Sequence, residues 1–482
     1  MRAIISHPLV RGAGLLALLA WAPLPFGSVT PGSASVLVAG GLFLVALALA
    51  SEGAATIPRA ATRVALALLA VAAFGAAQSF GWPAKLVRQL SPTHAEQVAM
   101  TDEILAREEP SRVPLTFAPE TTRRTAAVWT MAACALLAGA LLGRSRRTRR
   151  GILFVLIVGS LFQAYFGYQQ WQLRSSTIWG VEVPNQAVRM RGTFVNPNHL
   201  ATYLLIVVPA AFAALWWLLR RLRASRRGGR RLLPLGLLAI VWIALFTALA
   251  FTGSRAGMLA GLAALALQLA LIARAGEKRR VFWGGVALVG AALGYVAYSS
   301  FEAGLGRLTR LTEQGGFRLE GMADTWKLFT RFPWTGVGLG AFRAAFPLVH
   351  PVGEEGTWWH AHNDWLELAA TTGVVGLALA GYGLYWLARG LARSWLRGAR
   401  SEDRAAALAA IGACVAIGLQ ELLEFGLTQP ANSFTLAVVC GAALAVPLAP
   451  DAPPSPAAGA DAMAASSNSL HAESAAHSRG ER

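Results

Sequence analysis

Apolar runs of about 20 residues recur along almost the whole chain, and each is long enough to cross a hydrocarbon core of roughly 30 Å as a helix. Of the 482 residues, 55% are hydrophobic and 14% are charged, whereas a soluble chain carries about a quarter charged residues. The runs are continuous and lack the period-two alternation of barrel strands. The sequence therefore predicts an all-α fold, that of a polytopic integral membrane protein.

We expect about twelve transmembrane helices in a single membrane domain that covers residues 1–449. The expected spans are 12–28, 33–50, 61–81, 125–143, 151–168, 199–219, 232–252, 256–273, 281–299, 370–388, 405–425 and 431–449. The first 30 residues have the charge and apolar stretch of a secretory signal, but many spans follow, so they are interpreted as a retained first span. Residues 450–482 are rich in Ala, Ser and Pro, which predicts a disordered cytoplasmic tail.

The net charge of +18 is concentrated in short basic loops between the apolar runs. These loops are residues 144–150, 220–231, 274–280 and 389–404. In a count of about twelve spans they all fall on one side, which the positive-inside rule assigns to the cytoplasm. This distribution favours a lipid bilayer as the partner and excludes nucleic acid.

Three longer segments then fall on the opposite, periplasmic side: residues 82–124, 169–198 and 300–369. The last of these is a large loop before the tenth span. The three cysteines, Cys134, Cys414 and Cys440, lie inside apolar runs, which indicates neither a disulfide framework nor a cysteine metal site.

The tight turn Thr252-Gly253-Ser254-Arg255 joins two spans on the predicted outer side. Arg255 stands at the N-terminus of the following helix, where free N–H groups and the helix dipole favour an anion. An arginine at such a position is suited to hold a phosphate group. The alternative is an arginine that reaches the lipid headgroups or pairs within the bundle.

Arg189 and Arg191 precede Asn196-Pro197-Asn198, in which Asn198 is a plausible N-cap for the sixth span. One interpretation is a capped helix entry with two exposed arginines. The other places Arg191 beside Arg255, with both contacting one diphosphate. The local sequence leaves the two interpretations open.

The large loop contains His360-Ala361-His362-Asn363-Asp364-Trp365-Leu366-Glu367, and its histidines have two interpretations. His360 and His362 can ligate a metal together with Glu354 or Asp364, but no third ligand stands at a diagnostic spacing, so we expect no metal. Asp364 to Glu367 is an acidic variant of the capping box, which marks a helix start. This places His362 at the helix mouth, where a histidine can act as general base or hydrogen-bond donor.

The same loop carries two weaker signals. Residues 317–332 have helical spacing with an apolar side, and Arg318 in this stretch is either a third anion contact or a solvated charge. The run Gly336-Val337-Gly338-Leu339-Gly340 resembles a phosphate loop superficially. It lacks the downstream Lys-Ser/Thr and the strand–turn–helix context, which excludes a nucleotide site of that type.

Several of these motifs, in this order, resemble the O-antigen ligase and O-antigen polymerase superfamily. They are Arg191-Gly-Thr-Phe-Val-Asn-Pro-Asn, Thr-Gly-Ser-Arg255, the Arg318 to Trp326 spacing, Pro333-Trp-Thr-Gly-Val-Gly-Leu-Gly, and His360-Ala-His-Asn-Asp-Trp-Leu-Glu followed by Thr372-Gly-Val-Val-Gly. The resemblance covers residues 185–390, whereas residues 1–120 match only in being membrane spans.

The resemblance implies an inner-membrane glycosyltransferase that acts at the periplasmic face in surface polysaccharide biosynthesis. Such an enzyme passes a glycan from undecaprenyl diphosphate to an acceptor hydroxyl, without a cofactor or a metal. The acceptor is a lipid A-core sugar for a ligase and another lipid-linked saccharide for a polymerase. We favour these two activities. The alternatives are a protein O-oligosaccharyltransferase of the same superfamily and a transporter or flippase of lipid-linked sugars.

The expected catalytic residues are His362, Arg255 and Arg191, with His362 activating or orienting the acceptor hydroxyl and the arginines holding the diphosphate. Transporters often show inverted repeats and broken midplane helices. The polar residues here gather at one face and no repeat is visible, which favours an enzyme. The expected substrate-binding residues are Arg189, Asn196, Asn198, Arg318, His360, Asn363 and Glu367.

Overall fold

In the computed structural model the chain divides into two compact units, Met1–Pro447 and Leu448–Arg482, and the first contains the helices described below. The structure describes residues 8–53, 56–108, 110–183, 189–223, 232–275, 283–287, 289–290, 294, 311–350 and 358–450. The predicted disordered tail therefore lies almost entirely outside the described residues. The same holds for Glu354, one of the candidate metal ligands, and for most of the predicted span 281–299.

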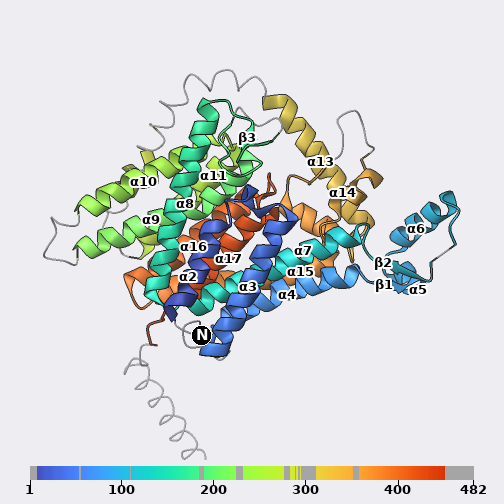
Figure 1. The fold of residues 1–482 in the computed structure, drawn as a ribbon, viewed down its shortest axis with the longest axis horizontal. Helices are drawn as coiled ribbons and strands as arrows, with labels where there is room; N and C mark the ends of the chain where they lie inside the picture. The colour runs from blue at the N-terminus through green and yellow to red at the C-terminus, as the bar shows by residue number, and fades with distance from the viewer. Residues whose placement is uncertain are drawn as a thin grey trace, which may run out of the picture. The chain divides into compact units, whose positions relative to one another are not determined.

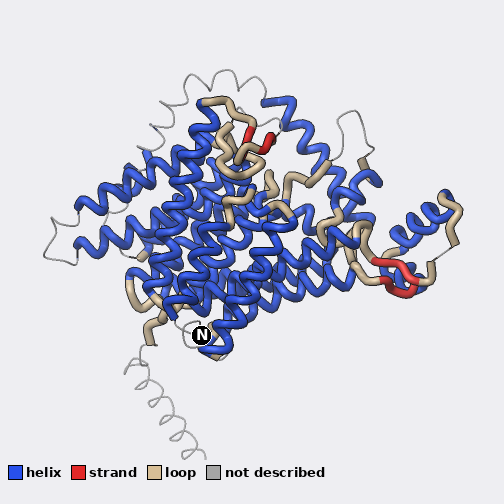
Figure 2. The backbone as a smooth tube through the Cα atoms, viewed as in Figure 1, coloured by secondary structure: helices blue, strands red, loops and turns tan. Residues whose placement is uncertain are grey.

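Helices dominate the described part of the chain (Figures 1 and 2). The long ones are α2 (Pro8–Trp21), α3 (Pro31–Glu52), α4 (Arg59–Gln78), α7 (Pro119–Leu142), α8 (Arg146–Gln172), α9 (Pro197–Arg223), α10 (Leu232–Phe251), α11 (Arg255–Arg274), α13 (Leu311–Arg331), α15 (Asp364–Arg397), α16 (Ser401–Gln420) and α17 (Pro430–Leu444). The short ones are α5 (Ala84–Leu90), α6 (Pro92–Ile104), α14 (Phe342–Ala345), η1 (Phe26–Ser28), η5 (Phe346–Leu348) and η6 (Gly426–Thr428). The fold is all-α, as predicted.

The only strands among the described residues form two small antiparallel pairs. β1 (Gly81–Pro83) pairs with β2 (Arg112–Pro114), and Trp82 lies opposite Val113. β3 (Thr177–Ile178) pairs with β4 (Val181–Glu182), and Ile178 lies opposite Val181. Both pairs close loops between helices.

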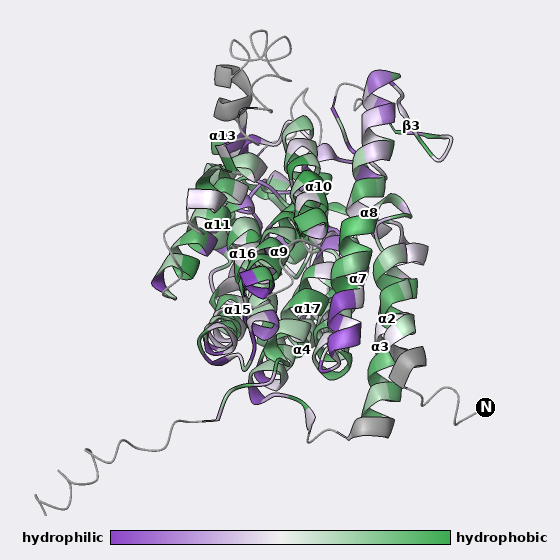
Figure 3. Ribbon diagram, turned by 90° about the vertical axis from the view of Figure 1, so that its left-hand side faces the viewer, coloured by the Kyte–Doolittle hydropathy of each residue, from purple (hydrophilic) through white to green (hydrophobic). Residues whose placement is uncertain are grey.

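Eight of the described helices are long and apolar enough to cross a membrane: α3, α4, α7, α8, α9, α10, α11 and α15. The predicted spans 12–28 and 431–449 correspond to shorter apolar helices, Gly12–Trp21 and Pro430–Leu444. The predicted span 405–425 corresponds to α16, which ends at Gln420. Figure 3 shows hydrophobic residues along the long helices and hydrophilic residues toward their ends. The chain is a multi-pass membrane protein.

Two ion pairs join the start of α8 to the start of α16, so the arginine-rich segments that lead into these helices lie at the same end of the bundle. Arg149 donates to Asp403 at 2.6 Å, with both side chains buried, and Arg150 donates to Glu402 at 2.7 Å. The other end carries the β1–β2 pair with α5 and α6, the β3–β4 pair, α13 and α14 (Figure 1). Two of the four predicted basic loops, 144–150 and 389–404, therefore meet at one end of the bundle, whereas most of the other two, at residues 224–231 and 276–282, lies outside the described residues.

The glycine-rich stretch 336–340 packs against a break in α15. The helix changes direction at Gly373, which has a φ of +64°, and a Cβ there would meet the backbone of Trp334. The N–H groups of Val337 and Gly338 donate to Ala370 O and Thr371 O, each at 3.0 Å. The Leu339 N–H donates to Gln78 Oε1 at 3.0 Å. Because these three N–H groups bond inside the protein, the stretch anchors the first half of α15 rather than presenting them to a phosphate.

Helix α9 lies at the centre of the main core. Its residues from Pro197 to Trp216 are buried, and it packs against α16, α10 and α11. Gln268 on α11 donates to Pro209 O on α9 and to Leu408 O on α16, at 3.0 and 2.9 Å. These hydrogen bonds fix the middle of α9 against two neighbouring helices.

Candidate functional site

The histidine motif leads directly into α15. Asn363 is the N-cap of this helix, because its Oδ1 accepts a hydrogen bond from Leu366 N at 3.0 Å. Our interpretation of Asp364 to Glu367 as a capping box was therefore wrong by one residue. An asparagine caps a helix as well as an aspartate does. The cap leaves the Asp364 and Glu367 carboxyl groups free for other contacts.

Glu367 reaches back over the helix start and holds the histidine segment. Its Oε1 and Oε2 lie 3.0 and 3.2 Å from His360 Nδ1, and Oε2 accepts a hydrogen bond from Ala361 N at 2.9 Å. Burial lowers the pKa of His360, but the charge and hydrogen bond of Glu367, with the charge of Asp364, outweigh burial and raise it. Glu367 therefore fixes both the tautomer and the orientation of His360.

His362 is held in an unusual conformation beside an arginine. Its φ of +51° lies in the left-handed region, which residues with a side chain seldom adopt. Burial, followed by the charges of Arg318 and His360, lowers the pKa of His362 to about 4. Its imidazole is therefore neutral at pH 7, the form that accepts a proton. Its Nδ1 is buried and has no partner among the described residues.

Phe425 is the centre on which three histidines converge. His360 stacks on its ring at a centroid distance of 4.5 Å, whereas His199 and His362 each meet it edge-on at 4.9 Å. His199 comes from the first turn of α9, and Phe425 comes from the turn between α16 and α17. Segments more than 160 residues apart in the sequence thus form one aromatic cluster.

The turn that carries Phe425 also contains Glu421 and Glu424, whose buried carboxyl groups lie beside this cluster. Glu421 accepts a hydrogen bond from Gly426 N at 2.6 Å, and its backbone carbonyl accepts one from Asp364 N at 3.0 Å. Burial, then the charge of Asp364, raises the pKa of Glu421. Asp364 Oδ2 in turn accepts a hydrogen bond from Leu427 N at 3.3 Å. These contacts bind the turn to the start of α15.

Glu424 connects the turn to two of the predicted arginines. Arg318 on α13 donates to Glu424 Oε1 at 3.0 Å and to Leu423 O at 3.3 Å. Burial raises the pKa of Glu424, while Arg318, then Asn198 and Arg189, oppose the rise. The Arg318 side chain is 35% exposed and that of Glu424 only 4% exposed. Arg318 is thus partly open to solvent, whereas the Glu424 carboxylate to which it is bonded is enclosed by the protein.

Arg189 joins the first turn of α9 to the α10–α11 turn. Its Nη2 donates to Asn198 Oδ1 at 2.5 Å, and its Nε donates to Thr252 O at 2.7 Å. In the same α10–α11 turn, Ser254 caps α11 by accepting a hydrogen bond from Gly257 N at 3.2 Å. Arg255 is the first residue of α11, and its side chain is exposed without a partner among the described residues. Its charge is therefore available to a ligand.

Two expectations for the residues around 191–198 require correction. Arg191 is completely buried, and its guanidinium donates to Val183 O and Ser175 O at 3.5 and 3.3 Å. It holds the β3–β4 loop, and in this conformation it does not stand exposed beside Arg255. Asn196 takes the place we expected for Asn198, because its Oδ1 accepts a hydrogen bond from Asn198 N at 2.9 Å at the start of α9. The Asn198 side chain instead accepts from Arg189.

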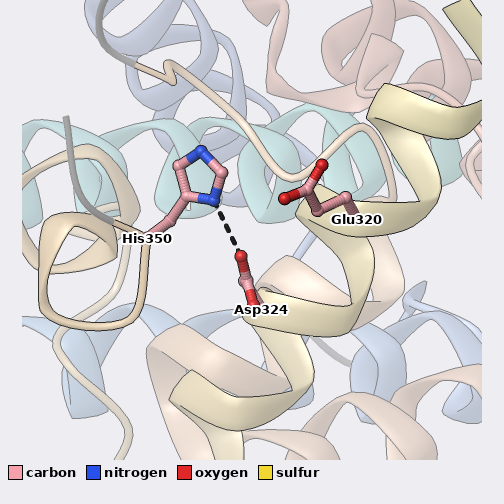
Figure 4. Close-up of side chains that lie close together, drawn as sticks. All are labelled: Glu320, Asp324 and His350. Carbon is pink, nitrogen blue, oxygen red and sulfur yellow. Dashed lines mark hydrogen bonds and ion pairs between the residues drawn. The ribbon is translucent and has the colours of Figure 1, made fainter. Parts of the chain in front are cut away.

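One cluster of side chains has the composition of a metal site (Figure 4). The ligand atoms of Glu320, Asp324 and His350 all lie within 4.8 Å of one another. However, Asp324 Oδ2 bonds His350 Nδ1 at 2.7 Å, and Asp324 Oδ1 accepts from Lys327 Nζ at 2.7 Å. A metal ion would have to displace the Lys327 ammonium and the His350 hydrogen bond. We interpret the cluster as the link between α13 and the turn at His350.

The structure brings together most of the predicted site residues and adds four that we missed: His199, Glu421, Glu424 and Phe425. Glu421, Glu424 and Phe425 fall within the predicted span 405–425, where we took them for the end of an apolar helix. Two carboxylates three residues apart at the end of such a span were an available signal, because ionisable residues at membrane depth usually have a function. The contacts of Phe425 with three histidines have no local sequence signal.

Part of the chain is similar to a known protein family. Residues 239–381 match the family model described as O-antigen ligase. The match covers less than a third of the chain, from α10 to the middle of α15, and leaves out Arg189, His199 and the turn at 421–425. No curated protein matches the chain. Residues 239–381 of this multi-pass membrane protein are therefore similar to the O-antigen ligase family.

Proposed function

We propose that the protein transfers a glycan from undecaprenyl diphosphate to an acceptor hydroxyl at the periplasmic face of the bacterial inner membrane. One observation carries the proposal. The first turn of α9, the α10–α11 turn, α13, the start of α15 and the turn at 421–425 meet at one place. That place combines arginines that can hold a diphosphate with a neutral histidine that can accept a proton.

The donor side of the proposed site consists of Arg255, Arg318 and Arg189. Arg255 is exposed at the N-terminus of α11, where free backbone N–H groups add to its positive charge. Arg318 is partly exposed, and Arg189 is held by Asn198 and Thr252. As the bond between the anomeric carbon and the diphosphate oxygen breaks, negative charge grows on the diphosphate. Fixed guanidinium groups stabilise that charge. Arg191 has a positioning role, since it is buried behind this segment.

On the acceptor side, His362 accepts the proton of the acceptor hydroxyl as its oxygen bonds the anomeric carbon. In the free protein, the positive charge of Arg318 contributes to the low pKa of His362. A diphosphate bound at Arg318 would offset that charge and raise the proton affinity of His362. Donor binding would thus make His362 a stronger base. His360, held by Glu367, and Asn363, the cap of α15, keep His362 in place.

The proposed chemistry uses only side chains of this chain and includes no metal or cofactor. The donor's polyprenyl tail requires a bilayer beside the site, and the described helices α8, α10 and α15 carry exposed apolar side chains such as Phe154, Ile240 and Tyr385. The basic turns at 144–150 and 398–401 lie at the other end of the bundle. If those turns face the cytoplasm, the site faces the periplasm.

A deletion strain tests the proposal and identifies the acceptor. We expect the strain to accumulate glycan on undecaprenyl diphosphate and to lose the mature surface polysaccharide. Long chains on the carrier would indicate a ligase, and single repeats would indicate a polymerase. Loss of glycosylated protein with intact polysaccharide would indicate a protein O-oligosaccharyltransferase. A strain without any accumulated lipid-linked species would contradict the proposal.

The complementing variants make the test specific to the site. Wild-type protein should restore the polysaccharide, whereas Arg255→Ala at the same abundance should not. Arg331→Ala is the matched control. Arg331 is also an exposed outer arginine, but it lies at the end of α13, where it donates to Leu348 O at 2.7 Å. We expect Arg331→Ala to complement like the wild type.

A further inference from the structure

His199 is a buried histidine in the cluster to which no role has been given. It lies in the first turn of α9, and its backbone is fixed at both ends. Its N–H donates to Asn196 O at 3.0 Å, and its carbonyl accepts from Asn432 Nδ2 at 3.1 Å. The ring meets Phe425 edge-on at 4.9 Å. The position of the imidazole is therefore set by the fold.

The two ring nitrogens of His199 have no hydrogen-bond partner among the described residues. The residue is only 5% exposed, and both Nδ1 and Nε2 are buried. A buried polar group without a partner costs about 1–3 kcal/mol. The sequence has a histidine at this position, although a phenylalanine would pack against Phe425 without that cost. This points to a ligand group that forms hydrogen bonds with the two ring nitrogens.

His94 shows what a structural histidine in this protein looks like. It is 3% exposed and lies edge-on to Phe117 at 4.3 Å, much as His199 lies against Phe425. However, its Nε2 bonds Pro114 O at 2.8 Å. His94 therefore has a partner within the fold, whereas His199 has the same packing without a partner.

The neighbours of His199 indicate where its missing partner would lie. His199 shares the Phe425 ring with His360 and His362. Its imidazole therefore packs on the same phenylalanine ring as the proposed base. A group bound there would contact His199 and His362 together.

The chemistry of His199 favours a hydroxyl group over a phosphate. Burial and the position near a helix N-terminus both disfavour a charged imidazolium. A neutral imidazole offers one hydrogen-bond donor and one acceptor. A sugar hydroxyl also offers both, whereas a phosphate oxygen only accepts. We infer that His199 binds a hydroxyl group of the acceptor saccharide; this inference rests on the proposed function and extends its site beyond the residues matched by the family model.

The test compares three variants in two assays. His199→Phe keeps the ring packing and loses both nitrogens, His199→Gln restores a donor and an acceptor, and His94→Phe is the matched control. The first assay measures KM for donor and acceptor in transfer by the purified protein, with the host's own lipid-linked glycan as donor. The second measures saturation-transfer NMR of the lipid-free acceptor oligosaccharide: the core oligosaccharide if the deletion strain indicates a ligase, or the glycan of the lipid carrier if it indicates a polymerase, each released from its lipid by mild acid.

We expect His199→Phe to raise the acceptor KM about 10-fold or more, leave the donor KM unchanged and lose the NMR signal. His199→Gln should recover part of the acceptor affinity and part of the NMR signal, and His94→Phe should match the wild type in both assays. If His199 is purely structural, the opposite result is expected: His199→Phe is active in transfer and His199→Gln is impaired. That result would overturn the inference while the proposed function stands.

The NMR assay separates the two failures. If the wild type does not transfer glycan but binds the oligosaccharide in a His199-dependent manner, the proposed function fails and the saccharide site remains. If His199→Phe binds the oligosaccharide as well as the wild type does, the inference fails whatever the transfer assay shows. If even the wild type neither transfers nor binds it, both are overturned.

Discussion

Glu367 provides the sharpest test of how the site is built, because one carboxylate holds two neighbouring residues of the histidine segment. It contacts His360 Nδ1 at 3.0 and 3.2 Å and Ala361 N at 2.9 Å. Ala361 is fully buried, and the Glu367 side chain is 10% exposed. Glu367→Ala removes both contacts and leaves the left-handed backbone at His362 without its support.

The expected loss follows from the two contacts. A hydrogen bond between charged groups contributes about 1.5–3 kcal/mol, and a buried N–H left without a partner costs about 1–3 kcal/mol. The His360 side chain is 28% exposed, so water replaces part of its contact and the lower end of the sum applies. That lower end, about 2.5 kcal/mol, corresponds to a loss of roughly 70-fold in transfer. Glu367→Gln keeps an amide oxygen but loses the charge, so we expect a loss of about 10-fold.

The assay is the initial rate of transfer by purified protein, with abundance and thermal unfolding measured in the same detergent. Glu320→Ala is the control, since Glu320 is an exposed carboxylate on α13. We expect it to transfer at the wild-type rate. NMR titration of His360 adds an independent measurement. Its pKa should fall in Glu367→Gln, because the carboxylate that raises it is gone. Transfer by Glu367→Ala within about twofold of the wild type would refute this account of the site.

Three further predictions concern charge and topology. Arg255→Lys should impair transfer at normal abundance, because it keeps the positive charge but loses the planar fork of the guanidinium. Arg255→Ala should cost about 2–4 kcal/mol of transition-state stabilisation, and a fully active alanine variant would exclude a role for Arg255 in holding the diphosphate. The wild-type kcat/KM should fall as pH drops through about 4, where His362 takes up a proton. Arg318→Gln removes a positive charge that lowers the His362 pKa, so this acidic fall in kcat/KM should move to higher pH. An unchanged pH profile would contradict the interaction between Arg318 and His362. In a cysteine-free background, an impermeant reagent applied to intact cells should label Gly356→Cys and spare Gly228→Cys, and the reverse pattern would contradict the topology.

The fold class was predictable because the bilayer imposes it on the sequence. A chain with continuous apolar runs of about 20 residues has few folds open to it in lipid. The same physics predicts the four basic loops at one end, and the two whose ends the structure describes, 144–150 and 389–404, are joined by ion pairs. Span ends were less predictable, since α16 stops at Gln420, five residues before the predicted end, and a polar turn follows. Hydropathy does not reveal that the chain leaves the helix at this point.

The site was predictable only in part, because long-range packing decides which polar residues meet. The motifs at Arg189, Arg255, Arg318 and His360 each had a local signal, and the structure brings them into one region. The burial of Arg191 has no such signal, since an arginine before a turn looks the same whether it is exposed or enclosed. The role of Phe425 likewise depends on three residues distant in sequence.

The central claim is that a neutral histidine at the mouth of α15, and not a metal ion, activates the acceptor. The measurement is transfer from purified undecaprenyl-diphosphate glycan in excess EDTA, for wild type, His362→Ala and His360→Ala. A general base contributes about 10²–10⁴-fold, so we predict full wild-type activity in EDTA, severe loss in His362→Ala and a milder loss in His360→Ala. Loss of wild-type transfer in EDTA that added divalent metal restores would contradict the account.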